Sequence, residues 1–255
     1  MFFWAAIEIY SFKKKYRDIF GGEQAKGATE CYNRRTFGRN GYKIMVARLE
    51  QEHSPLNEVE RPGSVGVALV IVAIGSYGSG DGPLVWTIAE KTTKPETEKY
   101  EGQISLPAET KKTGEKLLEN LVGALAEFTD SDEAIQDLFI LPETFISQQP
   151  ALVRGMQVDI AFLLYRGPTQ VTHIPLDTPE IEAHGWMPAR EIAKLNGEVR
   201  GLAHDSLTLA LSTGVLETLA REQERAIPLR GLLHPDFSIR RFIQERDKRP
   251  DISLS

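Results

Sequence analysis

The feature that most limits how this chain can fold is an apolar run of ten residues, VGVALVIVAI, at positions 65–74. A helix that crosses a bilayer needs about 20 apolar residues, so this run is too short to span one. Its content of valine and isoleucine predicts a buried strand instead. A glycine-rich segment, 75–82, follows, and residues 84–89 have the composition of a second strand. Together they predict a hairpin within a sheet.

The glycine-rich segment 75–82 also has to be weighed as a phosphate-binding loop. Such loops open a helix, whose N-terminal amides and dipole hold the anion. This segment leads into a strand. The order of elements therefore excludes the dinucleotide-binding and P-loop patterns.

The remaining chain alternates between strand and helix patterns. Leu117, Leu121 and Leu125 recur at helical spacing, so residues 115–128 are predicted to form an amphipathic helix. Further strands are predicted at 103–106, 136–141, 158–165, 170–175 and 180–188. Further helices are predicted at 188–195 and 203–225. Several strands with a central helix and two later helices predict an α+β or α/β sandwich.

The composition narrows the classes of function. The 255 residues carry 30 Lys and Arg against 36 Asp and Glu, a net charge of −6, and 41% of them are hydrophobic. This composition is typical of a folded domain. An acidic balance argues against general nucleic-acid binding, which favours a basic surface, and indicates a small charged metabolite as the partner. Cys31 is the only cysteine, which excludes an internal disulfide and a cysteine-based zinc cluster.

The first ten residues are almost wholly apolar, but Glu8 interrupts them and Lys13, Lys14 and Lys15 follow. A secretory signal carries its positive charges first and ends at a small-residue cleavage site. Because those features are missing, we expect a cytoplasmic protein that does not contact the membrane.

A locally basic segment lies near the N-terminus, where residues 11–50 hold ten Lys and Arg against four acids, or +6. Arg34, Arg35 and Arg39 stand among glycines there and are candidate substrate contacts, because arginine offers forked donors to a phosphate. A solvated turn is the alternative. Two prolines in 51–62 mark a linker. The predicted organisation is an N-terminal extension (1–62), a main domain (63–225) and an irregular, charged C-terminal tail (226–255).

The segment 102–130 carries the one recognisable motif. It resembles the Nudix box, G-x5-E-x7-R-E-U-x-E-E-x-G-U, which spans a strand, a loop and a helix. Gly114 and Glu115 match the glycine-glutamate pair, Glu127 matches the first glutamate of the E-E pair, and Pro107 matches the proline of the preceding turn. The resemblance extends in layout over about residues 63–220 and implies an α/β/α sandwich with a mixed β-sheet.

The segment also departs from the box at five positions. Glu109 stands at the opening glycine, Gly123 at the arginine, Ala124 at the glutamate that usually binds the principal metal, Phe128 at the second glutamate of the E-E pair, and Asp130 at the closing glycine. Of the three helix carboxylates of the family, Glu127 alone remains.

The resemblance implies a hydrolase of a nucleoside diphosphate-linked compound that uses Mg²⁺ or Mn²⁺ held on hard oxygen ligands. It implies Glu127 and Glu115 as catalytic residues and Glu127, Glu115 and Glu119 as metal ligands. Since the box is degenerate, we expect the activity to be weak or lost. A further metal ligand outside the box is conceivable at Glu143, Glu180 or Glu182.

Three alternatives stay open at this point. The first is a non-catalytic nucleotide-binding or regulatory module, to which the basic segment 33–48 would add phosphate contacts. The second is an accidental match of layout in another α/β domain. The third concerns Glu119, which can simply stabilise the N-terminal half of its helix, as acids there do. The resemblance is also compatible with a homodimer.

Overall fold

The computed structural model describes residues 63–73, 83–142, 144–147, 149–171, 173–176, 178–195 and 197–252. All of them belong to one compact unit of the chain. The expected phosphate contacts Arg34, Arg35 and Arg39 lie outside the described residues, as does the loop of the first hairpin. Within the described residues, no helix is long and apolar enough to cross a membrane.

A mixed sheet forms the centre of this unit. Its two long strands, β1 (Ser64–Ala73) and β7 (Met156–Tyr165), run parallel, with Val67 opposite Asp159 and Ala73 opposite Tyr165. The strand β2 (Leu84–Glu90) pairs antiparallel with β1, so the predicted hairpin is confirmed.

The described residues contain nine strands in this sheet, and the main path runs β3-β2-β1-β7-β5-β9. Three more strands pair beside it: β4 with β1, β6 with β7 and β8 with β2. The shorter strands are β3 (Ile104–Ser105), β4 (Ala108–Thr110), β5 (Leu138–Ile140), β6 (Ala151–Val153), β8 (Ile181–Pro188) and β9 (Ile227–Pro228).

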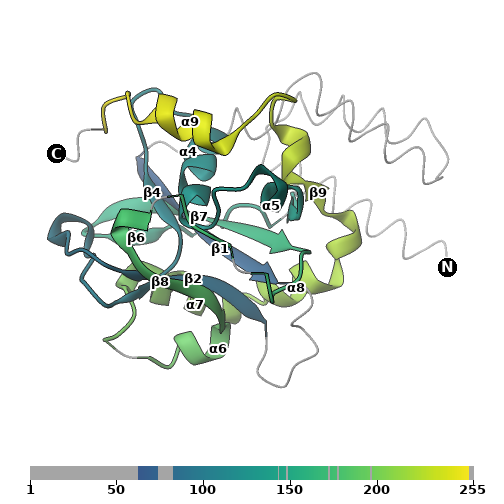
Figure 1. Cartoon of the computed structure of the whole chain (residues 1–255). Coiled ribbons are helices and arrows are strands. Elements are labelled where there is room, and N and C mark those ends of the chain that lie inside the picture. Colours follow the sequence, from purple (N-terminus) through teal and green to yellow (C-terminus); the bar gives the residue numbers. More distant parts are fainter. Residues whose placement is uncertain are drawn as a thin grey trace. The chain divides into compact units, whose positions relative to one another are not determined.

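Helices cover both faces of the sheet. The helix α4 (Leu117–Ala124) packs on β1 and β4, and α7 (Gly201–Ser212) packs on β1 and β6. Figure 1 shows α4 and α9 (Ile239–Arg246) on one side of the sheet, and α6 (Ala189–Ile192) and α7 on the other. The remaining helices are α5 (Asp132–Gln136), α8 (Val215–Arg221) and the 3₁₀ helices η3 (Pro95–Thr97), η4 (Leu125–Glu127), η5 (Thr178–Glu180), η6 (Gln223–Arg225) and η7 (Leu229–Leu232). The predicted α+β sandwich with a mixed sheet is confirmed.

The central strand explains why the opening apolar run is continuous rather than alternating. Residues 67–73 of β1 are fully buried. A strand covered by helices on both faces has no solvent side, so each of its positions favours an apolar residue. Val70 and Val72 face the core that contains Leu207 and Ala210 of α7.

Several elements differ from the sequence-based expectation. The helix predicted at 115–128 is α4 followed by the 3₁₀ turn η4. The helix predicted at 203–225 is broken into α7 and α8 by Gly214, whose φ of 65° is left-handed and ends a helix.

The prediction of a strand at 170–175 is wrong, because the described residues of this range, 170–171 and 173–175, form no strand. The carbonyl of Ile174 accepts from the Asp130 amide at 2.8 Å, and the nearby Leu176 amide donates to the Ala126 carbonyl at 2.7 Å. The backbone thus bonds to the end of the η4 region instead of a strand, and His173 turns inward.

The C-terminal segment contains more structure than an irregular tail. It begins with β9, which pairs with β5, and it includes α9, whose Ile239 and Arg246 are buried. Ile239, Ile243 and Arg246 follow helical spacing, which identifies the inward face of α9. The boundary predicted between the domain and the tail at 225/226 stays a prediction.

Candidate functional site

Glu115, the glutamate of the box, forms a buried ion pair with an arginine from the far end of the chain. Arg246 donates from Nε to Oε1 at 2.6 Å and from Nη2 to Oε2 at 3.0 Å. The Lys112 amide also donates to Oε2, at 2.8 Å, and Arg246 Nη2 donates to the Thr110 carbonyl at 2.6 Å. Burial lowers the pKa of Arg246, but Glu115 and Glu109 outweigh it and the pKa is raised. Both charges of this pair are satisfied inside the protein.

Gly123 makes this contact possible. A Cβ at residue 123 would lie 2.7 Å from Arg246 Nε and 2.9 Å from Cζ, closer than real Cβ contacts. The box has its arginine at this position, whereas here the guanidinium reaches over Gly123 from α9. The glycine and the distant arginine therefore depend on each other.

Glu119 contacts two groups near the N-terminus of α4. Its Oε2 accepts from the Lys116 amide at 3.0 Å, and its Oε1 accepts from Arg249 Nη1 at 3.2 Å. An acid at this position of a helix satisfies an otherwise free amide and the dipole. These contacts support the helix-stabilising alternative for Glu119.

Glu127 lies in a different cluster, at the end of η4. Its Oε2 accepts from the Ala108 amide at 2.7 Å, and its Oε1 is 4.0 Å from Lys99 Nζ. Lys99 Nζ also lies 2.9 Å from Glu90 Oε2 and 3.0 Å from Glu180 Oε2. Three carboxylates from separate elements thus surround one ammonium group.

The turn that precedes Lys99 directs it inward. Lys94 and Lys99 form an antiparallel bridge on either side of η3. Glu98, which follows η3 and precedes Lys99, has a left-handed φ of 54°. Lys94 pairs with the second oxygen of Glu180. The Lys99 side chain is only 7% exposed.

Burial and charge act in opposite directions on this cluster. Burial raises the pKa of Glu127 to about 8, although Lys99 and the Ala108 amide oppose the shift. Burial lowers the pKa of Lys99, but Glu127 and Glu90 outweigh it and the pKa is raised overall. Lys99 therefore stays charged throughout the neutral pH range, whereas Glu127 holds its proton more strongly than an ordinary glutamate.

The position of the second E-E glutamate is filled by an aromatic cluster. Phe128 is fully buried, and its ring centroid lies 4.4 Å from that of His173 and 5.1 Å from that of Trp86. His173 Nε2 is 2.8 Å from the hydroxyl of Tyr165. The members of the cluster are Trp86, Phe128, Tyr165, His173, His184 and Trp186. An apolar environment of this kind disfavours a metal ion and its water ligands.

These residues do not fit the Mg²⁺ or Mn²⁺ that the box implies. Glu115, Glu119 and Glu127 contact three different internal cations, respectively Arg246, Arg249 and Lys99. The side chains of Ala124 and Phe128 carry no oxygen atom. Across the part of the chain that the structure describes, no group of three or more His, Cys, Asp or Glu side chains is arranged to hold a metal ion.

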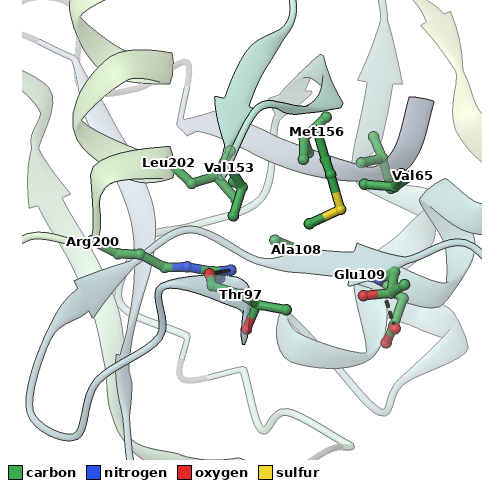
Figure 2. A pocket seen from close by; sticks show the side chains of 12 residues that line it. Val65, Thr97, Ala108, Glu109, Val153, Met156, Arg200 and Leu202 are labelled. Atoms are coloured by element: carbon green, nitrogen blue, oxygen red, sulfur yellow. Dashed lines mark hydrogen bonds between the residues drawn. The ribbon is translucent and has the colours of Figure 1, made fainter. Parts of the chain in front are cut away.

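A cavity of about 50 Å³ lies next to the Lys99 cluster and is open to solvent on one side. In Figure 2, Arg200, Thr97 and Glu109 lie along the lower side of the cavity. Leu202, Val153 and Met156 lie along its upper side. Arg200 Nη2 donates to the Thr97 carbonyl at 2.8 Å, and Nη1 lies 3.6 Å from Glu90 Oε1. Ala108 lines the cavity while its amide binds Glu127, so the cavity and the cluster share a wall.

Four central residues of this region escaped sequence reasoning. Glu90 and Lys99 lie at the end of a strand and in a charged loop, and Arg200 and Arg246 lie far along the chain. No spacing rule joins such positions. The helical periodicity of α9 is the one signal that could have identified Arg246 as an inward-facing residue.

No protein-family model matches the chain, and neither does any curated protein. Among solved structures, it is similar to a Nudix hydrolase from M. Smegmatis, RenU, at 15% identity and a TM-score of 0.42 over 60% of this chain and 87% of that chain. A mutT/nudix family protein from Listeria innocua has 16% identity and a TM-score of 0.40 over 63% and 99%. The NUDIX domain of Shewanella oneidensis NrtR, complexed with ADP ribose, has 13% identity and a TM-score of 0.38 over 66% and 96%. All three belong to the family whose box residues 102–130 resemble.

Proposed function

We propose that the described domain binds a small, anionic, nucleotide-like ligand and does so without a metal ion on its box helix. The observation that carries this proposal is that each of the three expected metal ligands, Glu115, Glu119 and Glu127, lies beside a cation of the chain itself. A carboxylate that is paired in this way has little capacity to bind and polarise a hydrated Mg²⁺, and the same holds for Glu127, whose pKa of about 8 keeps it mostly protonated at neutral pH.

The cavity beside Arg200 is the proposed ligand site. Arg200 is only 7% exposed, and its Nε has no hydrogen-bond partner in the described part of the chain. A buried donor without a partner costs free energy, which an acceptor oxygen of a ligand would recover. Valine and methionine side chains form the opposite wall. The cavity accommodates one end of a ligand, and the rest lies along its open side.

The test is thermal melting of the full chain with ADP-ribose, a nucleoside diphosphate linked to a sugar, in the presence of EDTA. A ligand that binds the folded state alone raises the melting temperature by mass action. We expect stabilisation of the native chain and its loss in Arg200→Met. Arg200→Lys should retain it in part, since a lysine keeps the charge but loses the forked donors.

Arg190→Met is the matched control, because Arg190 is exposed on α6 and does not line the cavity. Equal stabilisation of Arg200→Met and the native chain would remove Arg200 from the site. No stabilisation of the native chain by ADP-ribose would contradict the proposed ligand class.

A second candidate function is slow hydrolysis of a nucleoside diphosphate-linked compound with Mg²⁺ or Mn²⁺, with Glu127 and Glu115 catalytic and with Glu127, Glu115 and Glu119 as metal ligands. Glu127, Glu90 and Glu180 surround Lys99, so this candidate requires that the metal ion displace the Lys99 ammonium. It requires that Glu127→Gln abolish product formation from ADP-ribose. Product formation that survives this substitution would exclude Glu127 from the chemistry.

Three predictions from sequence remain proposals beside these. Arg34, Arg35 and Arg39 would add phosphate contacts from the N-terminal extension. The chain would be cytoplasmic, and it would form a homodimer. Analytical ultracentrifugation of the full chain tests the last of these directly.

A further inference from the structure

Three carboxylates point at one nitrogen atom beside the proposed ligand site. Glu90 ends β2, Glu127 ends η4 and Glu180 ends η5, and their nearest oxygens lie 2.9, 4.0 and 3.0 Å from Lys99 Nζ. Glu90 is fully buried, and the Glu127 side chain is 6% exposed. Segments that are distant in sequence thus deliver oxygen ligands to a single cation.

The position of Glu90 shows how strongly this arrangement depends on a cation. Neither of its side-chain oxygens makes a hydrogen bond within the described residues. Its charge is compensated by Lys99 at 2.9 Å and by Arg200 at 3.6 Å. A buried carboxylate of this kind is costly unless a positive charge stays beside it.

The other cations nearby do not replace Lys99. Lys94 pairs with Glu180 but not with Glu90 or Glu127, and Arg200 pairs with Glu90 alone among the three acids. Lys99 is the described cation that contacts all three. An ammonium sits at about 2.7–2.9 Å from a carboxylate oxygen, whereas Mg²⁺ or Ca²⁺ draws oxygens in to roughly 2.0–2.6 Å. With Lys99 in place the three acids are too far apart to hold a divalent ion, and Glu127, whose Oε1 is 4.0 Å from the ammonium, would have to move inward the most.

We propose that the Lys99 ammonium acts as a tethered cation that occupies a latent divalent-metal site formed by Glu90, Glu127 and Glu180. In the native chain Lys99 neutralises these acids and keeps Mg²⁺ and Mn²⁺ out. Removing the ammonium leaves an oxygen-rich site in which Arg200 still compensates part of the charge of Glu90 and Lys94 part of that of Glu180. A divalent cation then supplies the positive charge that is missing. This inference rests on the proposed absence of a functional metal in the native chain, but it concerns cation binding alone and needs no nucleotide.

The test is titration of the full chain with Mn²⁺, followed by the electron paramagnetic resonance signal of free Mn²⁺. We expect Lys99→Ala and Lys99→Gln to bind one Mn²⁺ with a Kd at least about tenfold lower than the native chain, a difference of about 1.4 kcal/mol. Mn²⁺ should also raise the melting temperature of both variants and leave that of the native chain unchanged.

Three controls locate the effect. Lys94→Ala removes a cation from Glu180 but leaves Lys99 in place, so it should not gain Mn²⁺ binding. Adding Glu127→Gln to Lys99→Ala should abolish the gain. Adding Glu182→Gln should preserve it, because Glu182 is exposed and lies outside the cluster.

The proposal is overturned if the native chain binds Mn²⁺ as tightly as the Lys99 variants, or if folded Lys99 variants gain no binding. It is equally overturned if neither variant folds in millimolar Mn²⁺, because a fitting cation should replace the lost charge. None of these results depends on ADP-ribose, so they are separable from failure of the proposed ligand binding.

Discussion

At the scale of single residues, the site is explained by which charges lie inside and what neutralises them. Glu127 matches a glutamate of the box, and sequence alone places it on the helical segment. The sequence does not show that Lys99 and the Ala108 amide contact it, because those contacts depend on the fold of a charged loop. The chemistry of Glu127 therefore depends on neighbours that only the fold brings into contact with it.

The raised pKa of Glu127 predicts a specific pH dependence of stability. The pKa is about 8 in the folded protein against an ordinary value of 4.5, so the folded state binds more protons between these values. The contribution of Glu127 to stability is present below pH 4.5 and is lost as the pH rises through 8. In Glu127→Gln, the free energy of unfolding should fall less steeply from pH 5 to about pH 8. Urea unfolding at a series of pH values measures this slope.

Glu182→Gln is the control for that slope, since Glu182 is an exposed carboxyl on the neighbouring strand β8. Its pH profile should follow that of the native chain. Identical profiles for Glu127→Gln and the native chain would show that Glu127 is not the group responsible.

Phe128 gives a second prediction at this scale. Its ring is fully buried among Trp86, Tyr165 and His173. Truncation of such a ring leaves a cavity, so Phe128→Ala should lower the free energy of unfolding by about 3–5 kcal/mol. Phe237→Ala, which changes a ring outside the buried core of the domain, serves as the control in the same urea titration. A loss of less than about 1 kcal/mol in Phe128→Ala would contradict the packing described.

At the scale of elements, the periodicity of the sequence predicts what regular burial dictates. The continuous apolar run gives β1, and the leucines of 117–125 give α4. Periodicity does not predict the structure where one backbone angle or a few hydrogen bonds determine it. Gly214 splits the long helix through its backbone angle, and residues 170–175 bond to η4 rather than to a strand.

The contact between α4 and α9 is such a case, and it predicts a reversal of sign. Gly123→Ala places a Cβ against Arg246, which Glu115 and Thr110 hold in place, so it should destabilise the native chain. Without the arginine, the same change should stabilise by about 1 kcal/mol, since alanine favours a helix over glycine. Arg246→Ala alone should cost about 3–5 kcal/mol, because Glu115 is left buried and unpaired.

A double-mutant cycle in urea unfolding measures this coupling. Gly167→Ala is the control, because a Cβ at Gly167 would meet Tyr165 and Asp137 rather than Arg246. Its effect on the free energy of unfolding should add to that of Arg246→Ala without coupling. Additive effects of Gly123→Ala and Arg246→Ala would show that the Arg246 guanidinium does not need a glycine at position 123, which would contradict the contact described.

At the scale of the whole molecule, the fold class follows from the order of patterns, whereas the state of the site does not. Alternation of strands and helices predicted a sandwich, which the mixed sheet with helices on both faces confirms. The departures from the box indicated that metal ligands were missing. Only the three-dimensional structure shows that Arg246 lies beside Glu115 and Lys99 beside Glu127, where they supply positive charge.

We expect ligand binding in this domain not to require a metal ion, because internal cations lie beside its acids. Isothermal titration of ADP-ribose into the full chain tests it, once in EDTA and once in millimolar Mg²⁺. We expect the same Kd in both buffers and intact ADP-ribose at the end of each titration. Binding that appears only with Mg²⁺, accompanied by breakdown of the ADP-ribose, would contradict it.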